Sequence, residues 1–262
     1  KEEIISKFNL LVDGKDVAEI LEVDYNTLVY YLYRRSEKSN YTKFYLNKRS
    51  GGKREILKPI TPILLLQRKL NNILHFIYTP KNCVHGFITQ RNILTNAQVH
   101  AKRNAILNID IKDFFTSINF GRVRGMLMGP PYNLPHKAST VLAQICCAEG
   151  ALPQGAPTSP IISNMICAKL DSELLRLARK YNCFYTRYAD DITFSTSKKN
   201  FPKSIGQLIH DEEDTYVQIG NSLQKIIDDN GFILNHSKAR IQKNGRRKEV
   251  TGLTVNESPN VK

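Results

Sequence analysis

Three aspartates stand in contexts that favour metal-dependent chemistry. Asp190 and Asp191 are adjacent within residues 183–197 (CFYTRYADDITFSTS), a pattern that predicts two short strands joined by a tight turn. Two adjacent carboxylates repel each other, so they need a compensating cation or a raised pKa. Asp-Asp pairs also occur in solvated turns, and this pair alone leaves a metal site and an ordinary turn equally open.

The neighbouring elements are expected to bring a third carboxylate to this pair. Residues 105–111 (AILNIDI) alternate apolar and polar side chains, which predicts a half-buried strand with Asp110 near its end. From here the predicted order is strand, helix, strand, strand, helix, strand, the split βαβ (ferredoxin-like) arrangement of an α+β fold. In that sheet the first strand neighbours the central hairpin, so Asp110 should face Asp190 and Asp191. Three carboxylates at one sheet edge suit Mg²⁺.

The part of the chain before this sheet is predicted to be helical, with one basic hairpin. Residues 16–35 predict two short packed helices. A helix-turn-helix is less favoured, because the second helix is aromatic and not rich in base-reading polar groups. Residues 41–59 predict a β-hairpin with a Ser50-Gly51-Gly52 turn and a basic tip, suited to phosphate contact or to solubility. The other predicted elements are helices at 62–78, 91–102, 136–148, 159–177 and 217–229, and a strand around 232–242.

The composition indicates a folded protein with an anionic partner. The chain has 262 residues, 41% of them hydrophobic, with 38 Lys and Arg against 24 Asp and Glu and a net charge of +14. This excess favours a nucleic-acid partner, with a solubility surface as the alternative, and its dispersal favours a basic channel formed by the fold. No apolar run approaches the roughly 20 residues that span a bilayer, and no secretory signal is expected. Five cysteines without paired spacing favour a reducing compartment.

Five short motifs follow one another along the chain. Three of them resemble motifs of reverse transcriptases: NIDIKDFF (108–115), LPQGAPTSP (152–160) and YADD (188–191), which fits the YxDD box. Two more resemble marks of the retron type, namely NAQVH (96–100), which fits NAxxH, and VTG (250–252). With Gly86-Phe87, the resemblance covers roughly residues 15 to 256. The chain therefore resembles the retron-type bacterial reverse transcriptases.

This resemblance implies a right-hand polymerase fold with fingers and a ferredoxin-like palm. We expect an N-terminal helical segment over 1–40, fingers over 41–104, and a palm over 105–248 with finger-like insertions near 120–150. Residues 249–262 would form the primer-grip region and the start of the thumb. Because retron enzymes continue into a helical thumb, most of the thumb is expected to lie outside this sequence.

The resemblance assigns catalytic and metal-binding roles. Asp110, Asp190 and Asp191 match the metal-binding aspartates, and the carbonyl of Ile111 would be an additional ligand. In polymerases two such ions lie about 3.5–4 Å apart. Lys238 matches the lysine that would protonate the departing pyrophosphate, with an exposed lysine on a strand as the alternative.

The resemblance also assigns contacts to nucleotide and to RNA. Phe115 would stack under the incoming sugar as a steric gate that disfavours a 2′-hydroxyl. The expected nucleotide-binding residues are Arg54, Lys53 (with Lys48 as a further candidate), Phe115, Gln154 and Gly155. The motifs of the retron type would recognise RNA or primer, or else brace the fingers against the palm, through Asn96, His100, Val250, Thr251 and Gly252.

The implied activity is RNA-directed DNA synthesis in the bacterial cytoplasm, with no membrane partner. The enzyme would bind its own structured noncoding RNA as template and primer, use dNTPs and Mg²⁺ (or Mn²⁺ in vitro), and extend a guanosine 2′-hydroxyl into branched msDNA. An effector protein or fused effector domain and a role in antiphage defence are also implied. The alternatives are a group II intron or diversity-generating reverse transcriptase, and a non-catalytic RNA-binding protein on a polymerase fold. The three aspartates weigh against the last.

Overall fold

The computed structural model describes residues 1–47, 51–210 and 215–260, and contacts within the chain divide it into two units. One unit consists of Lys1–Thr79 and Phe115–Ile166, and the other of Pro80–Phe114 and Cys167–Lys262. This division differs from the expected bounds, because residues 80–104 group with the sheet and residues 115–166 group with the N-terminal helices. The naming of these units as fingers and palm remains a prediction.

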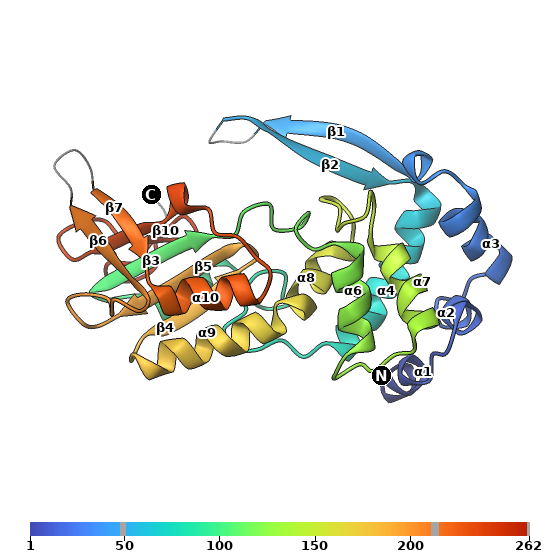
Figure 1. Ribbon diagram of the computed structural model, residues 1–262, viewed down its shortest axis with the longest axis horizontal. Coiled ribbons are helices and arrows are strands. Elements are labelled where there is room, and N and C mark those ends of the chain that lie inside the picture. Colours follow the sequence, from blue (N-terminus) through green and yellow to red (C-terminus); the bar gives the residue numbers. More distant parts are fainter. Residues whose placement is uncertain (48–50, 211–214, 261–262) are drawn as a thin grey trace. The chain divides into compact units, whose positions relative to one another are not determined.

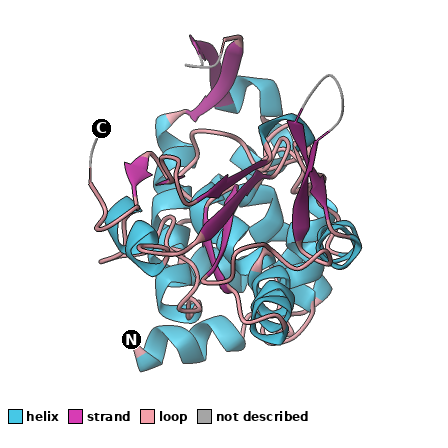
Figure 2. Ribbon diagram, turned by 90° about the vertical axis from the view of Figure 1, so that its left-hand side faces the viewer, coloured by secondary structure: helices cyan, strands magenta, loops and turns pink. Residues whose placement is uncertain are grey.

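The second unit is organised around a four-stranded antiparallel sheet (Figure 1). Its helices α9 (Ala168–Lys180) and α10 (Asn221–Asp229) pack against each other along one face of the sheet (Figures 1 and 2). This order and layering confirm the predicted ferredoxin-like topology. The strands, in spatial order, are β4 (Phe184–Tyr188), β5 (Asp191–Thr196), β3 (Ala105–Asp110) and β8 (Arg240–Lys243).

Strand β3 lies inside this sheet and is more buried than its alternating sequence predicts. Five of its six residues are buried, and only Asn108 is partly exposed. Ile106 belongs to an apolar cluster with residues of α5 (Ile93–Val99), β9 (Glu249–Val250) and β10 (Leu253–Thr254). Since α9 and α10 occupy one face of the sheet and this cluster adds a second layer, the strand is covered on both sides.

The last part of the second unit departs from the prediction in two ways. A hairpin of β6 (Gly206–His210) and β7 (Thr215–Ile219) precedes α10, where only a helix from about 217 was expected. The helix begins at Asn221, because Ile219 still pairs with Gly206. The strand expected around 232–242 is confined to β8, and a 3₁₀ turn, η3 (His236–Lys238), precedes it.

The first unit contains the predicted N-terminal helices and the basic hairpin. Asp13 and Asp24 cap α2 and α3, so the break at Asp24 separates two helices as predicted. No helix within the described ranges is long and apolar enough to cross a bilayer. The elements are α1 (Glu2–Asn9), α2 (Gly14–Ile20), α3 (Tyr25–Val29), η1 (Tyr30–Arg34), η2 (Glu37–Asn40), β1 (Tyr41–Asn47), β2 (Lys53–Pro59), α4 (Thr61–Ile77), α6 (Phe120–Met128), α7 (His136–Cys146) and α8 (Ser159–Ile166).

Candidate functional site

The sheet register places two of the three aspartates directly opposite each other. Asp110 at the end of β3 pairs with Asp191 at the start of β5, and Asp190 precedes Asp191 in the turn. Directly opposed residues of an antiparallel pair share one face of the sheet, with Cβ atoms ~5 Å apart. The amide of Ile111 donates to the carbonyl of Asp190 over 3.1 Å, which ties the end of β3 to the turn.

The turn between β4 and β5 needs a close neighbour without a side chain. Ala189 has a φ of 57°, in the left-handed region that non-glycine residues seldom occupy. Gly86 lies against it, and a Cβ at Gly86 would stand 2.4 Å from the amide nitrogen of Ala189. Only glycine fits at this approach, which gives a physical reason for the Gly86-Phe87 segment in the second unit.

The electrostatics of the site reflect clustered negative charge. Loss of hydration and repulsion by Asp190 and Asp110 raise the pKa of Asp191 to about 6, although its side chain still reaches solvent. Lys238 on η3 compensates part of this charge, since its Nζ lies 2.9 Å from Oδ1 of Asp110. The hydrogen bond with Asp110 raises the pKa of Lys238, so this side chain is a cation at neutral pH.

These carboxylates have the chemistry of ligands for a hard divalent cation. Mg²⁺ prefers oxygen ligands and is commonly held by one or two carboxylates together with substrate phosphates. Loss of hydration is the main cause of the raised pKa of Asp191, and the negative charges of Asp190 and Asp110 add to it; a cation would relieve this charge. Among the residues described, however, no three His, Cys, Asp or Glu side chains are gathered closely enough to hold a metal ion. The ammonium of Lys238 occupies one carboxylate oxygen of Asp110 in this arrangement.

The expected nucleotide-binding residues of the hairpin and the 152–160 loop meet within the first unit. The amide of Leu57 on β2 donates to the carbonyl of Gln154 over 2.8 Å. Gly155 has a φ of 116°, and a Cβ there would lie 2.8 Å from Cγ2 of Ile56. The loop therefore packs on the strand that carries Arg54, and Gly155 permits this approach.

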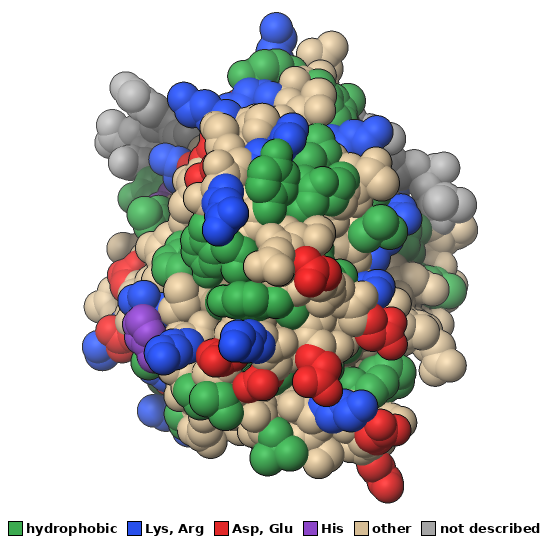
Figure 3. Space-filling model, turned by 90° about the vertical axis from the view of Figure 1, so that its right-hand side faces the viewer, with side chains coloured by type: hydrophobic (Ala, Val, Ile, Leu, Met, Phe, Trp, Pro, Cys, Tyr) green, Lys and Arg blue, Asp and Glu red, His purple; other side chains and the backbone are tan. Residues whose placement is uncertain are grey.

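The basic side chains of the hairpin remain open to solvent. Lys53 and Arg54 are exposed at the start of β2, opposite Asn47 and Leu46 of β1. Of the charged side chains along the top of the face shown in Figure 3, most are Lys and Arg; β1 and β2 lie at this level in Figure 1. The weaker candidate Lys48 and the turn residue Ser50 lie outside the described residues. Phe115 is half-buried at the start of the second segment of this unit.

The NAxxH and VTG motifs contact each other, although 155 residues separate Asn96 from Thr251. The Asn96 side-chain amide donates to Oγ1 of Thr251 over 3.4 Å, and Val250 packs in the same apolar cluster as Ala97. Asn96 and Val250 are buried, whereas Thr251 is partly exposed and Gly252 is exposed. Of the residues expected to recognise RNA, only Thr251 and Gly252 offer surface to it in this structure.

His100 is an internal brace of the aspartate hairpin. Its Nδ1 lies 2.7 Å from Oγ of Ser195 on β5, and its Nε2 lies 2.7 Å from Oγ1 of Thr186 on β4. Burial lowers the pKa of His100 to about 3, so the ring is neutral, with one nitrogen donating and the other accepting. The side chain is fully buried. This geometry favours the bracing interpretation over direct contact with RNA, and the brace acts within the second unit.

Comparison with known proteins identifies the family. The family model described as reverse transcriptase (RNA-dependent DNA polymerase) matches residues 47–255. The chain belongs to the reverse transcriptase family. Within this family, the chain is 33% identical to the retron Mx65 reverse transcriptase of Myxococcus xanthus, a match that covers 92% of this chain and 58% of that protein. It is 32% identical to the retron Ec86 reverse transcriptase of Escherichia coli, over 92% and 71% of the two chains.

These relatives place the chain with the retron reverse transcriptases. The chain spans only a little more than half the length of the two Myxococcus xanthus relatives, 58% of Mx65 and 54% of Mx162. A solved structure supports the fold: telomerase from Candida albicans in complex with a fragment of telomeric RNA has a TM-score of 0.53 at 10% identity. That match covers 83% of this chain and 45% of the telomerase chain.

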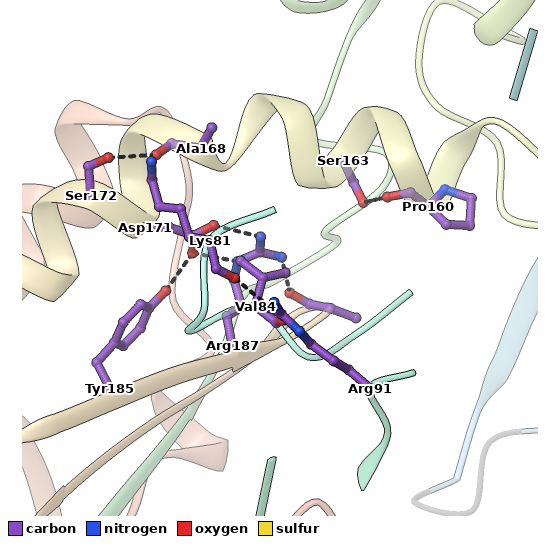
Figure 4. A network of polar contacts seen from close by, with 11 residues as sticks. Lys81, Val84, Arg91, Pro160, Ser163, Ala168, Asp171, Ser172, Tyr185 and Arg187 are labelled. Carbon is purple, nitrogen blue, oxygen red and sulfur yellow. Dashed lines mark hydrogen bonds and ion pairs between the residues drawn. The ribbon is translucent and has the colours of Figure 1, made fainter. Parts of the chain in front are cut away.

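Sequence reasoning missed one group of buried charges beside the aspartate turn. Asp171 on α9 and Arg187 on β4 form an ion pair with both side chains inaccessible to solvent (Figure 4). Charged residues are almost never fully buried unless they are paired, and the partner of Asp171 lies 16 residues away on another element. The one available signal was a charged residue, Arg187, in an otherwise uncharged strand directly before the YADD turn.

Proposed function

We propose that this chain is the polymerase part of a bacterial retron reverse transcriptase that copies RNA into DNA. One observation carries the proposal: Asp110 and Asp191 oppose each other in the sheet, with Asp190 beside them, in a chain of the reverse transcriptase family. A module that only binds RNA has no use for three carboxylates near one strand end, because they would repel the phosphate backbone. The clustered charge therefore favours catalysis over RNA binding alone.

The aspartates would hold Mg²⁺, with the carbonyl of Ile111 as a further ligand. When bound, two such ions activate the attacking hydroxyl and stabilise the charge that develops on the transferred phosphoryl group. Lys238 would then keep its proton next to the site and donate it to the leaving pyrophosphate, as its position beside Asp110 allows. Metal binding through Oδ1 of Asp110 would require the ammonium of Lys238 to move from that oxygen.

The first unit would supply the nucleotide contacts. Arg54 and Lys53 are exposed cations, and a guanidinium fork matches the oxygens of a triphosphate. Gln154 and Gly155 lie against the same strand through the contact with Leu57, so the pocket-lining loop and the cations share one support. Phe115 would stack under the sugar and exclude a ribose 2′-hydroxyl.

The RNA partner and the product are inferred from the retron relatives. We propose that the chain binds a cognate structured noncoding RNA, uses it as template and primer, and makes branched msDNA from a guanosine 2′-hydroxyl in the bacterial cytoplasm. An effector protein or a fused effector domain would act with it in antiphage defence. Of the retron-motif residues expected to recognise RNA, Thr251 and Gly252 have surface available, and the net charge of +14 suits a polyanionic partner.

The experiment that tests this function is isolation of the nucleic acid that copurifies with the full-length protein. The proposal predicts DNA joined to RNA through a 2′,5′ branch that a debranching enzyme cleaves. An Asp190→Asn/Asp191→Asn protein should copurify with RNA but with no DNA attached. Linear nucleic acid alone from the wild-type protein would contradict the retron product, and branched DNA from the double variant would contradict the aspartate site.

A further inference from the structure

A buried ion pair links helix α9 to the strand that leads into the aspartate turn. The Nε and Nη2 atoms of Arg187 donate to the two carboxylate oxygens of Asp171, each over 2.8 Å, and neither side chain reaches solvent (Figure 4). The hydroxyl of Tyr185 donates to the same carboxylate over 2.7 Å. This planar, two-pronged contact fixes the orientation of the guanidinium as well as its position.

The remaining arm of the guanidinium contacts the turn itself. Nη1 of Arg187 donates to the carbonyl oxygen of Ala189 over 3.0 Å. That carbonyl belongs to the peptide group joining Ala189 to Asp190. Ala189 has a left-handed conformation, and a non-glycine residue keeps such a conformation only where surrounding contacts hold it. Arg187 thus contacts the peptide group that directly precedes the Cα atom of Asp190.

The backbone of Arg187 is held on another side by the 81–91 segment. Its amide donates to the carbonyl of Cys83 over 2.8 Å, and its carbonyl accepts from the amide of His85 over 2.9 Å. Arg91 in turn donates to two carbonyls of this segment, each over 2.6 Å (Figure 4). The residue that contacts the turn is therefore anchored through both its backbone and its side chain.

Stability alone does not account for such a pair. An apolar pair of similar volume often stabilises a core as well as a buried ion pair does, since desolvation offsets the attraction between the charges. An apolar pair, however, cannot donate to the carbonyl of Ala189. We propose that Asp171 and Arg187 are positioning residues that orient the YADD turn, and with it Asp190, for metal binding. This proposal rests on the proposed polymerase function, and neither residue contacts substrate.

The main test replaces the pair by apolar side chains of similar size, Asp171→Leu with Arg187→Met. Packing is retained but the buried hydroxyl of Tyr185 loses its acceptor, so the melting temperature should fall by only about a few degrees. RNA-templated incorporation should lose about tenfold to a hundredfold in kcat, since small misplacements at a reacting centre cost this much. The Mg²⁺ concentration at half-maximal rate should rise while the KM for dNTP changes little. The matched control is Lys225→Ala with Asp229→Ala, which removes an exposed ion pair of α10. This control should change neither kcat nor the Mg²⁺ concentration at half-maximal rate.

A second variant and a second readout keep the result decisive. Arg187→Lys retains the charge opposite Asp171 but lacks the planar fork, so it should show the same shift in Mg²⁺ dependence even if the double variant does not fold. Direct Mn²⁺ binding, followed by electron paramagnetic resonance, should weaken in the variants without any need for turnover. A folded variant with wild-type Mn²⁺ affinity and Mg²⁺ dependence would overturn the positioning role. An inactive wild-type protein would instead overturn the proposed function, while the Mn²⁺ comparison would still decide the role of the pair.

Discussion

Lys238 Nζ lies 2.9 Å from Asp110 Oδ1, although 128 residues separate them in the sequence. The contact follows from the sheet, because the amide of Asn235 donates to the carbonyl of Asp110 over 2.8 Å and brings η3 to the end of β3. The ammonium of Lys238, a group able to donate a proton, thus lies beside the carboxylate of Asp110, which is expected to bind metal. In the proposed site this cation would oppose metal binding at Asp110 and would also protonate the departing pyrophosphate. Each role makes its own prediction.

Replacing Lys238 should separate catalysis from metal affinity. Lys238→Ala should lower kcat by about a hundredfold, the range of one general acid, because the proton donor beside Asp110 is lost. The Mg²⁺ concentration at half-maximal rate should fall, since Asp110 loses its competing cation. Steady-state primer extension at varied Mg²⁺ measures both quantities. Lys243→Ala is the charge-matched control, since the Lys243 side chain contacts Asn200. This variant should change neither kcat nor the Mg²⁺ concentration at half-maximal rate. An unaltered kcat in Lys238→Ala would exclude the proton-donor role.

His100 should make folding stability depend on pH in a defined window. Its pKa is lowered to about 3 in the folded protein by burial, against about 6.5 when unfolded, so the unfolded chain binds the extra proton. Its contribution is therefore complete above pH 6.5 and is lost as the pH falls towards 3. Between these limits, the free energy of unfolding of the wild type should fall by ~1.4 kcal/mol per pH unit more than that of His100→Gln. Urea unfolding at several pH values measures this difference. Parallel pH profiles for the two proteins would contradict the buried neutral brace.

Gly155 and Gly150 offer a matched pair for the hairpin contact. Both have positive φ, but a Cβ at Gly150 meets nothing within 4 Å, whereas one at Gly155 meets Ile56 at 2.8 Å. Gly150→Ala should lose only about 1–2 kcal/mol of stability from the left-handed backbone. Gly155→Ala should also raise the KM for dNTP by about tenfold, ~1.4 kcal/mol of binding, because the loop leaves β2. Equal KM values for the two variants would show that this contact does not shape the nucleotide pocket.

Phe115 should control the choice between dNTP and rNTP. Phe115→Val removes the ring expected under the sugar, so the ratio of kcat/KM for rNTP to that for dNTP should rise by about tenfold or more. Phe114→Leu is the neighbouring control, because the Phe114 ring is buried and stacks on Phe232 with centroids 6.0 Å apart. An unchanged ratio in Phe115→Val would remove Phe115 from the nucleotide site.

Local pattern predicted that Asp110 and Asp191 lie opposite each other, because each element that positions them has its own sequence signature. Alternation marked β3, the β-branched and aromatic residues around YADD marked the hairpin, and the split βαβ order then placed Asp110 opposite Asp191. The β6–β7 hairpin was missed, since a short hairpin before a helix leaves no strong period in the sequence.

Contacts between distant residues could not be predicted in the same way. His100 belongs to a motif that suggested RNA contact, and nothing local shows that hydroxyls of Thr186 and Ser195 enclose its ring. Asp171 stands beside the apolar stripe of α9, where a carboxylate is normally solvated, and only the fold reveals that Arg187 meets it there. Pairings of this kind depend on tertiary packing and not on periodicity.

The most direct test of the polymerase site is the rate of dNTP incorporation on an RNA template by full-length Asp190→Asn, compared with Asp113→Asn. Asn preserves the size of each side chain, and at Asp113 it also tolerates the φ of 48°. Loss of a metal ligand should lower kcat by about a thousandfold, ~4 kcal/mol of transition-state stabilisation. Asp113→Asn should retain the wild-type rate. Wild-type incorporation by Asp190→Asn would contradict a catalytic metal site at these aspartates.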